Sequence, residues 1–443
     1  MANTPAATEE VQRLLARFEN ANPANIVLGL KRITSALERL GSPHTNLPPV
    51  IHVAGTNGKG STIAFMRTIL AAAGLRVHVY TSPHLVKFNE RIVLAGEQIS
   101  DDMLASVLGR CESAAGDLPL TYFEASTAAA FLAFSETPAD VVLLETGLGG
   151  RLDATNVVPD PRACVITPIG MDHMDWLGDS IPAIAAEKAG IIKQGAAFVT
   201  GVQKPEAMDV LRHRALALGT EQHILGEDWQ LVREGSGFTY EDEQGLSDLA
   251  LPRMMGGHQI DNAGLAVAAL KAAGLAPSDD FISMGITATE WPARLQRLTK
   301  GPLAEMVTQH KGDPGELWLD GGHNAHAARA IARALADLED RNPRPLVLIV
   351  GMQKNKDPGD FLAPFEGLAS NVLTVAANKS GVWSGEDLAE AAQKAGLPAQ
   401  AMPSVTAAVE HTVEAFGRSG EGQPRILIAG SLYLAGEVLE KNG

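Results

Sequence analysis

The sequence predicts two α/β domains: a P-loop domain with a doubly wound, mostly parallel sheet, and then a smaller Rossmann-like α/β domain. Three observations predict this fold class. A glycine-rich loop joins a buried strand at 50–54 to a helix at 62–73. Apolar runs typical of strands then alternate with helical segments, as in a parallel sheet with crossover helices. The alternation restarts after residues 292–297, so we expect domains at 1–295 and 296–443.

The remaining elements follow the same alternation along the chain. Helices are predicted at 8–18, at a segment ending at 40, and at 101–115, 120–134, 181–189 and 256–273. Strands are predicted at 76–80, 140–145, 163–167 and 197–200, and in the second domain at 316–320, 345–350, 372–376 and 425–429. The polar segment 226–250 is expected to form a small antiparallel excursion. The small residues of the helix at 120–134 indicate close packing rather than a membrane face.

The glycine-rich loop, Gly55-Thr-Asn-Gly-Lys-Gly-Ser61, has the composition of a phosphate-binding site. Glycines let backbone N–H groups approach a phosphate, and the N-terminus of the following helix adds positive potential. Lys59 would supply a charge for the β- and γ-phosphates, and Ser61 a hydroxyl for Mg²⁺. In the usual pattern Ser or Thr directly follows the lysine, whereas Gly60 intervenes here. A tight turn without a ligand is the alternative interpretation.

Four residues, each at or just past the end of a predicted strand, are expected to converge at one edge of the sheet, where ligands bind in such folds. They are Gly55, Ser82, Glu145 and His173. Mg²⁺ prefers oxygen and keeps several waters, so Ser61, Ser82 and Glu145 suffice as ligands. For Glu145 the alternative is a buried acid paired with an arginine. Spacing alone favours a simple hydrogen-bonded histidine for His173 and a solvated helix residue for Lys188.

Composition limits the kinds of partner. The chain has 443 residues and a net charge of −16, which argues against nucleic acid and anionic membranes as partners. Its two cysteines, Cys111 and Cys164, exclude a disulfide framework or a cysteine-based zinc site, and Cys164 is expected in the core. The N-terminus does not resemble a signal peptide, and no apolar run approaches a membrane span. We expect a cytoplasmic enzyme.

Nine motifs together carry a specific resemblance. In chain order they are Gly55-Thr-Asn-Gly-Lys-Gly-Ser61, Tyr80-Thr-Ser-Pro-His-Leu85, Leu120-Thr-Tyr-Phe-Glu124, Glu145-Thr-Gly-Leu-Gly-Gly-Arg-Leu-Asp-Ala-Thr-Asn156, Asp172-His173, Glu187-Lys-Ala-Gly190, His258-Gln259 with Asn262, Pro292-Ala-Arg294 and Asp320-Gly-Gly-His-Asn324. The chain closely resembles the bacterial folylpolyglutamate synthase/dihydrofolate synthase family. These are Mur ligase superfamily enzymes, which use ATP to join a carboxylate to an amine. The resemblance covers nearly the whole chain.

The resemblance implies a nucleotide site with two metal ions. Ser82 and Glu145 would hold one Mg²⁺ and His173 the second. Lys188 would be carboxylated by CO₂ and so become an anionic oxygen ligand. The residues implied to act in catalysis are Lys59, His173 and Lys188. Those implied to bind ATP are Thr56, Asn57, Gly58, Lys59, Gly60, Ser61, Asn262, Arg294 and Asp320.

The resemblance also implies the organic substrates: 7,8-dihydropteroate, folates and L-glutamate. The residues expected against the pterin are Ile26, Val27, Leu28, Thr121, Tyr122, Phe123, Glu124, Leu152, Asp153 and Ala154. Phe123 would offer a ring for stacking and Asp153 a carboxylate for the donor edge of the pterin. For 26–28, core packing is the alternative. His323 and Ser431 are candidates for the incoming glutamate.

The implied reaction is phosphorylation of a substrate carboxylate by ATP, followed by attack of the glutamate amine on the acyl phosphate. We expect a monomer. A cell-wall Mur ligase is disfavoured, because only 54 residues precede Gly55 and such enzymes carry an additional N-terminal domain. A single-function folylpolyglutamate synthase stays open, although 121–124 and 152–154 favour the bifunctional enzyme. A P-loop nucleotide switch of the guanine-binding class lacks support, since the chain has no Asn-Lys-x-Asp.

Overall fold

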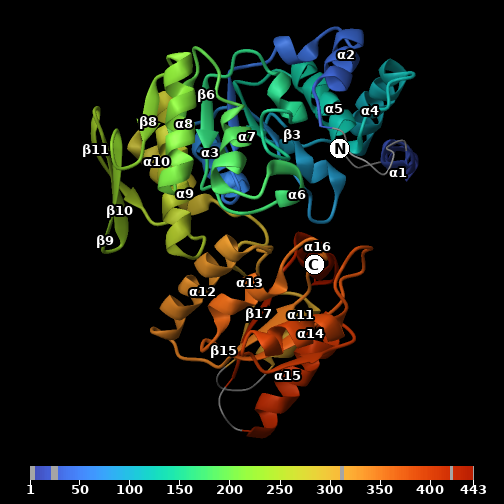
Figure 1. The fold of residues 1–443 in the computed structure, drawn as a ribbon, viewed down its shortest axis with the longest axis vertical. Helices are drawn as coiled ribbons and strands as arrows, with labels where there is room; N and C mark the ends of the chain where they lie inside the picture. The colour runs from blue at the N-terminus through green and yellow to red at the C-terminus, as the bar shows by residue number, and fades with distance from the viewer. Residues whose placement is uncertain (1–4, 21–27, 310–313, 420–422, 443) are drawn as a thin grey trace. The chain divides into compact units, whose positions relative to one another are not determined.

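The computed structural model describes residues 5–20, 28–309, 314–419 and 423–442, and these fall into two compact units (Figure 1). The first unit comprises Met1–Arg253 and Ile260–Thr289, and the second comprises Met254–Gln259 and Glu290–Gly443. Two predicted pterin-binding residues, Ile26 and Val27, lie outside the described residues. Within the described ranges, no helix combines the length and apolar character needed to cross a membrane.

The first unit is built on an eight-stranded sheet with the order β4-β3-β2-β5-β1-β6-β7-β8. Its strands are β1 (Val50–Ala54), β2 (Val77–Tyr80), β3 (Ile92–Leu94), β4 (Glu97–Gln98), β5 (Val141–Glu145), β6 (Ala163–Ile166), β7 (Ala197–Thr200) and β8 (Gln222–Ile224). The strands from β2 to β8 in this order are parallel, while β3 and β4 add an antiparallel edge. The predicted doubly wound, mostly parallel sheet is confirmed.

Helices cover both faces of this sheet. They are α1 (Pro5–Asn20), α2 (Lys31–Arg39), α3 (Lys59–Ala72), α4 (Asp101–Ala115), α5 (Tyr122–Glu136), α6 (Met174–Leu177), α7 (Ile181–Ala189), α8 (Pro205–Leu218), α9 (Gly257–Ala272) and α10 (Asp279–Ala288), with 3-10 turns η1 (Pro43–Thr45), η2 (Phe88–Arg91) and η3 (Ala154–Val157). Helix α3 begins at Lys59, so the predicted start at 62 was wrong: Gly58, in a left-handed conformation, is the last loop residue. Helix α5 is almost wholly buried, as its small residues predicted.

Residues on one face of β1 belong to two different apolar clusters. Val50 packs with α4 and α5, whereas Ala54 packs with α7 and α8, and both point to the same face because they are an even number of residues apart in the strand. Cys164 is fully buried in the second of these clusters, as predicted. His52 lies between Val50 and Ala54 on this face and is also fully buried.

The predicted antiparallel excursion forms a separate three-stranded sheet with the order β11-β10-β9. Its strands are β9 (Trp229–Glu234), β10 (Gly237–Asp242) and β11 (Gly245–Ala250). The Trp229 and Tyr240 rings stack with centroids 5.6 Å apart, and Lys271 of α9 pairs with Asp242 at 2.9 Å. The ion pair attaches the excursion to α9.

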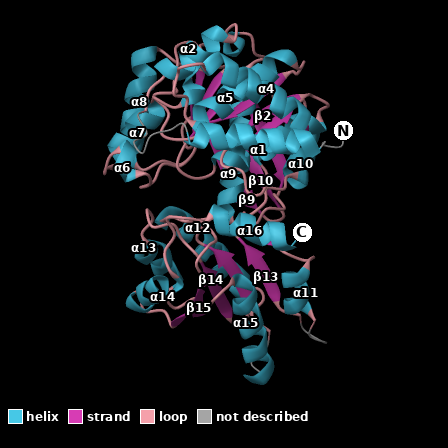
Figure 2. Ribbon diagram, turned by 90° about the vertical axis from the view of Figure 1, so that its right-hand side faces the viewer, coloured by secondary structure: helices cyan, strands magenta, loops and turns pink. Residues whose placement is uncertain are grey.

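The second unit has a six-stranded sheet with the order β12-β13-β17-β14-β15-β16. Its strands are β12 (Gln296–Arg297), β13 (Glu316–Leu319), β14 (Leu346–Val350), β15 (Ala369–Thr374), β16 (Ala399–Ala401) and β17 (Arg425–Ala429). Its helices are α11 (Pro302–Thr308), α12 (Ala325–Glu339), α13 (Pro358–Leu362), α14 (Gly385–Lys394), α15 (Val405–Ser419) and α16 (Leu432–Asn442), with the turn η4 (Ala363–Phe365). Helix α13 contacts both α12 and α14, α11 contacts α15, and Figure 2 shows the two groups flanking the strands.

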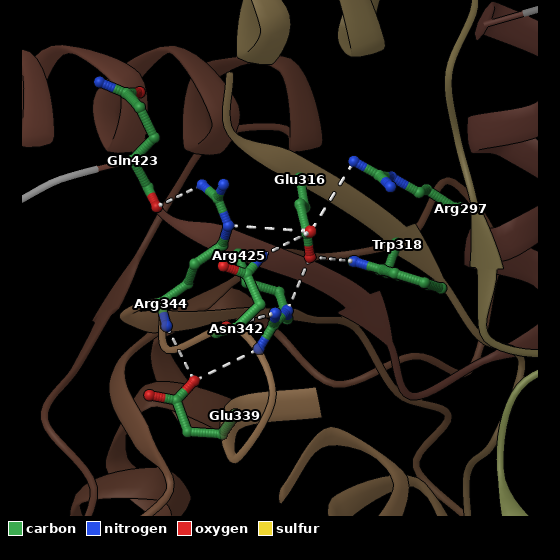
Figure 3. Close-up of polar contacts among 8 residues, drawn as sticks. All are labelled: Arg297, Glu316, Trp318, Glu339, Asn342, Arg344, Gln423 and Arg425. Carbon is green, nitrogen blue, oxygen red and sulfur yellow. Dashed lines mark hydrogen bonds and ion pairs between the residues drawn. The ribbon is translucent and has the colours of Figure 1, made fainter. Parts of the chain in front are cut away.

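A buried ionic network joins the amino ends of strands in this second sheet (Figure 3). Arg425, the first residue of β17, donates to Glu316 Oε2 at 2.8 Å and to Glu339 Oε2 at 3.3 Å. Trp318 Nε1 donates to the same Glu316 oxygen at 3.1 Å, and Arg344 lies 3.7 Å from Glu316 Oε1. Burial raises the pKa of Glu316, but the hydrogen bonds from Arg425 and Trp318 outweigh it and hold this pKa below its usual value.

Candidate active site

The loop between β1 and α3 is shaped by two glycines at which any side chain would collide. Gly55 has a φ of +153°, and a Cβ there would lie 1.8 Å from Thr167 Oγ1. Gly58 has a φ of +91°, and its Cβ would lie 2.6 Å from Asn262 Oδ1. The structure therefore places Asn262 of α9, a predicted ATP-binding residue, directly against the loop.

Hydrogen bonds attach the start of this loop to the segment after β6. The N–H of Thr56 donates to Pro168 O at 3.1 Å, and the Thr56 hydroxyl donates to Gly170 O at 3.1 Å. The Gly170 N–H in turn donates to that hydroxyl. Thr56 thus holds the loop in shape. Because first-turn N–H groups of a helix lack an intrahelical carbonyl, those of Lys59, Gly60 and Ser61 suit a phosphate better.

Three of the predicted residues meet at the end of β5. Glu145 is buried, and its Oε2 accepts a hydrogen bond from the backbone N–H of Ser82 at 3.1 Å. Its Oε1 lies 3.8 Å from Lys59 Nζ, so the acid forms an ion pair with this lysine of the loop. These oxygens, with the buried hydroxyl of Ser61 in the first turn of α3, fit a hard divalent cation.

Lys188 lies beneath the same loop. Its side chain is buried, and Nζ donates to Gly55 O at 3.0 Å. Lys59 Nζ donates to this same carbonyl oxygen at 3.3 Å. Burial and then the charge of Lys59 lower the pKa of Lys188 to about 7, although Asp172 and Asp153 oppose the shift. Lys188 is therefore no solvated helix residue.

Close backbone packing sets the position of Lys188. A Cβ at Gly190 would lie 2.4 Å from Arg151 Cα, and one at Gly150 would lie 2.7 Å from Glu187 O. The Arg151 N–H donates to Glu187 O at 2.7 Å, and its guanidinium pairs with the Glu187 carboxylate at 2.8 Å. The glycines in both segments let the end of α7 press against the loop that follows β5.

His173, the residue predicted to bind the second metal ion, is more exposed than Glu145 and Lys188. It has a φ of +52° at the start of α6, and its side chain is 42% exposed. Its N–H donates to Asp172 Oδ1 at 2.8 Å, while its Nε2 lies 4.0 Å from that oxygen. Within the described residues, no group of three or more His, Cys, Asp or Glu side chains could hold a metal ion. The ligands predicted for the two ions therefore do not form such a group among the described residues.

In the segment 121–124, which is predicted to contact the pterin, the polar side chains stabilise the start of α5. Thr121 accepts from Glu124 N at 3.1 Å and Glu124 accepts from Thr121 N at 2.8 Å, which is a capping box at the start of α5. Arg32 also pairs with Glu124 at 3.0 Å. These two side chains hold the helix start, whereas Leu28, Tyr122, Phe123 and Leu152 are half-buried and Ala154 is buried.

Asp153 closes the loop that follows β5. It is buried, and its Oδ2 accepts from Leu148 N at 2.8 Å. Its Oδ1 accepts from Thr155 N at 3.0 Å and from the Thr155 hydroxyl at 2.5 Å. Burial raises the pKa of Asp153, and these hydrogen bonds reduce the shift. A backbone hydrogen bond from Gly147 lowers this pKa as well, so donors from its own loop hold the carboxylate in place.

In the second unit, Asp320 shapes a strained turn that carries Arg294. Ala293 and Leu295, on either side of Arg294, have φ values of +55° and +39°. Asp320 Oδ2 accepts from Leu295 N at 2.8 Å, and its Oδ1 accepts from Gly322 N at 2.6 Å. Non-glycine residues hold such φ values only where the surroundings enforce them. The structure thus brings the predicted residues Arg294 and Asp320 together.

The two glutamate candidates follow the ends of neighbouring strands. The ring nitrogen Nδ1 of His323 lies 2.9 Å from Gly321 O, after β13. The Ser431 hydroxyl, after β17, accepts from Tyr433 N at 3.1 Å. Gly430 N donates to Gly322 O at 3.0 Å, so the two segments are adjacent.

Sequence reasoning assigned no role to two buried polar residues, His52 and Arg91. Arg91 donates to His84 Nδ1 at 2.9 Å, and its guanidinium lies 5.5 Å from the ring centroids of both Phe88 and Tyr122. The available signals were a histidine inside the apolar strand 50–54 and an arginine close to aromatic residues. Neither signal says which distant residue is the partner.

Comparison with known proteins places this geometry in a family. Residues 53–270 match the Mur ligase middle domain, and residues 304–432 match the glutamate ligase domain of Mur ligases. The dihydrofolate synthase/folylpolyglutamate synthase of Escherichia coli is 37% identical over 361 residues, which is 81% of this chain and 80% of that protein.

Solved structures agree in fold over nearly the whole chain. The structure of E. coli FolC in complex with DHPP and ADP has a TM-score of 0.86 and 32% identity, covering 99% of this chain and 98% of that one. A bifunctional folylpolyglutamate synthase/dihydrofolate synthase from Yersinia pestis, complexed with AMPPNP and Mn, has a TM-score of 0.84 and 31% identity, covering 99% of both chains.

Proposed function

This chain belongs to the Mur ligase family, among its dihydrofolate synthase/folylpolyglutamate synthases, and we propose that it adds L-glutamate both to dihydropteroate and to the γ-carboxyl group of folates. It is an ATP-dependent ligase that uses a divalent metal ion. The observation that best supports the proposal is the cluster of Lys59, Glu145 and Lys188 around the glycine-rich loop.

The reaction proceeds in two steps, phosphoryl transfer and then amide formation. An oxygen of the substrate carboxylate attacks the γ-phosphorus of ATP, which forms an acyl phosphate and releases ADP. The neutral amine of glutamate then attacks the acyl carbon, and the amide forms as phosphate leaves and the nitrogen loses a proton. Lys59 and the N-terminus of α3 would stabilise the negative charge on the transferred phosphoryl group. Magnesium held by Ser61, Ser82 and Glu145 would neutralise more of this charge.

We propose that Lys188 is carboxylated. A neutral lysine amine would attack the carbon of CO₂ and lose a proton, giving a carbamate with two oxygen atoms. The buried Nζ beside Lys59 supports this, because a second ammonium there repels both Lys59 and a metal ion. The carbamate would then serve, with His173, as ligand for a second Mg²⁺.

Further assignments rest on the resemblance of motifs. We propose that Asn262, Arg294 and Asp320 bind the nucleotide, that 121–124 and 152–154 contact the pterin, and that His323 and Ser431 meet the incoming glutamate. We also propose domains at 1–295 and 296–443, and that the enzyme is a cytoplasmic monomer. Light scattering at the mass of two chains would contradict the monomer.

A substrate-omission assay tests the function. The enzyme is incubated with MgATP, L-glutamate and dihydropteroate, and ADP release is measured with each organic substrate left out in turn. We expect release only when both are present. Replacing dihydropteroate by tetrahydrofolate tests the second activity. ADP release with tetrahydrofolate but not with dihydropteroate would identify a single-function folylpolyglutamate synthase. ADP release without any organic substrate would indicate a nucleotide switch.

A further inference from the structure

His52 occupies an unusual place for a polar residue. It is in the middle of β1, it is fully buried, and its neighbours on the same face, Val50 and Ala54, belong to apolar clusters. Its Nε2 lies 2.8 Å from Thr155 Oγ1 and 3.1 Å from Thr146 Oγ1. A single imidazole nitrogen thus contacts two threonines that flank the loop after β5.

The direction of these hydrogen bonds follows from Asp153. Both oxygens of this carboxylate already accept hydrogen bonds, and the one hydrogen of the Thr155 hydroxyl is donated to it at 2.5 Å. The Thr155 oxygen can therefore only accept from His52. The Nε2 atom must carry the proton, and the same N–H also faces the oxygen of Thr146.

The other ring nitrogen agrees with this tautomer. Nδ1 is buried and has no hydrogen-bond partner among the described residues. An N–H in that position would be a buried donor without an acceptor, which is costly. Burial, with the charge of Lys193, lowers the pKa of His52 to about 3, so the ring is neutral at physiological pH.

The two threonines mark the ends of a functional segment. Thr146 directly follows Glu145, a proposed metal ligand, and Thr155 directly follows 152–154, the proposed pterin contact. Asp153 accepts a hydrogen bond from Leu148 N, which links the two halves of this segment. The His52 N–H contacts both ends of this segment.

We propose that His52 is a positioning residue: its Nε2–H clamps Thr146 and Thr155 together and thereby fixes the loop that presents Asp153 to the pterin. This inference rests on the proposed function, because it deepens the role assigned to the loop. A purely structural residue at this place could be apolar, like Val50 and Ala54, and would leave no buried nitrogen without a partner.

The first test reads the tautomer in the unmodified protein. Histidine is labelled with ¹⁵N, and the His52 signals are assigned by their loss in His52→Gln. We expect a protonated Nε2 and an unprotonated Nδ1 that do not change between about pH 5.5 and 8.5, well above the lowered pKa of this ring. A protonated Nδ1, or titration in this range, would overturn the proposal whether or not any variant folds.

The second test compares two amides of different reach. The side-chain nitrogen of His52→Gln can occupy the position of Nε2, whereas that of His52→Asn reaches only the position of Nδ1. We expect His52→Gln to keep the KM for dihydropteroate within about threefold of the wild type. We expect His52→Asn to raise it about tenfold or more, since a hydrogen bond is lost, with the KM for ATP changed less than about threefold.

The outcomes separate this inference from the proposed function. Equal KM values for dihydropteroate in the two variants, or a KM for ATP that rises in step, would refute the positioning role. An unmodified protein that releases no ADP with dihydropteroate and glutamate would instead refute the proposed function, and the clamp would then have no pterin loop to position.

Discussion

The carbonyl oxygen of Gly55 accepts hydrogen bonds from two lysines that are far apart in sequence, Lys59 and Lys188. Two ammonium groups on one oxygen repel each other, so one of them is favoured to lose its proton. Lys59 keeps a counter-ion in Glu145 at 3.8 Å, whereas Lys188 is buried and its pKa falls to about 7. This difference supports the proposed roles, in which Lys59 supplies a charge and Lys188 a nucleophilic amine.

Lys59→Ala should lower kcat about 10²–10³-fold without unfolding the protein, because it removes one preorganised charge from the phosphate site. ADP release gives kcat, and circular dichroism reports folding. Lys394→Ala is the matched control, since Lys394 is 74% exposed and pairs with Glu390 on its own helix. A folded Lys59→Ala enzyme with normal turnover would remove Lys59 from the mechanism.

Lys188→Arg should be inactive, because a guanidinium keeps the positive charge and forms no carbamate. Lys188→Ala should also be inactive, but a short carboxylate such as acetate should restore part of its activity. Incubation in ¹³C-bicarbonate buffer should give a carbamate carbon signal in the wild type that is absent from both variants. An active Lys188→Arg enzyme would rule out carboxylation as a requirement.

At this scale the sequence predicts the residues better than their contacts. Strand ends of a parallel sheet meet at one edge, so the positions of Ser82 and Glu145 in the chain are enough to place them together. His52 and Thr155 are 103 residues apart in the sequence, and no periodic pattern of residues indicates that they form a hydrogen bond. The use of Asp320 to hold its own loop, through Leu295 N and Gly322 N, is equally invisible in the sequence.

At the scale of elements, the contact between α7 and the loop after β5 depends on glycine. Gly190→Ala should destabilise the protein by about 1–3 kcal/mol, because its Cβ would meet the backbone of Arg151 at 2.4 Å and one segment must shift. The shift would displace Lys188, so kcat should fall as well. Thermal unfolding and ADP release measure the two effects.

Gly109→Ala is the control for this variant. Gly109 lies in α4, and a Cβ there would meet nothing within 4 Å. Alanine in an open helical position should stabilise by about 0.5–1 kcal/mol, with activity unchanged. Equal stability in the two variants would mean that the contact with Arg151 is not tight.

The ionic network at the amino ends of β13 and β17 should matter for stability and not for chemistry. Arg425 is fully buried, so Arg425→Met leaves Glu316 and Glu339 short of a partner and should cost about 3–5 kcal/mol. Denaturant unfolding measures the loss. Arg418→Met removes an exposed pair with Glu414 and should change nothing measurable.

The same network predicts the direction of a pH effect. Because the pKa of Glu316 is lower in the folded state, its contribution is fully present above the unfolded value, about 4.3, and is lost as the pH falls through the folded value. The stability difference between wild type and Arg425→Met should therefore shrink below about pH 4. A difference that stays constant down to about pH 3 would contradict this assignment.

Sequence patterns located most of the strands and helices, and the reasons for the misses are physical. Strands β5, β7 and β17 are apolar runs, and their predicted ranges agree to within one residue. Strands β4 and β12 contain only two residues each, too few for a pattern to develop. The start of α3 was missed because Lys59 to Ser61 belong to the loop motif and the helix together.

At the scale of the whole molecule, the net charge of the protein has the same sign as the charge of its proposed ligands. The chain carries −16, while ATP and the proposed pterin and glutamate substrates are anionic. Attraction must therefore be local, and the described residues provide it through Lys59 and the N-terminus of α3. The net negative charge elsewhere keeps the protein from binding anions unspecifically.

The second unit contains what a domain needs to fold alone. Its apolar cluster runs from Leu295 to Ala429, and Met255 packs against it from outside this stretch. All six strands of its sheet and the ionic network lie between Gln296 and Asn442. A chain of about 150 residues can bury a sufficient core.

A fragment of residues 290–443 should therefore fold and unfold cooperatively by itself. Its circular dichroism should show mixed helix and strand, and its denaturation midpoint should match one transition of the full-length protein, because the same core and network are present. The fragment with Arg425→Met should lose the same free energy as the full-length variant, since additivity holds for independent units. An unfolded fragment, or a smaller loss than in the full-length variant, would mean that the stability of this unit depends on the rest of the chain.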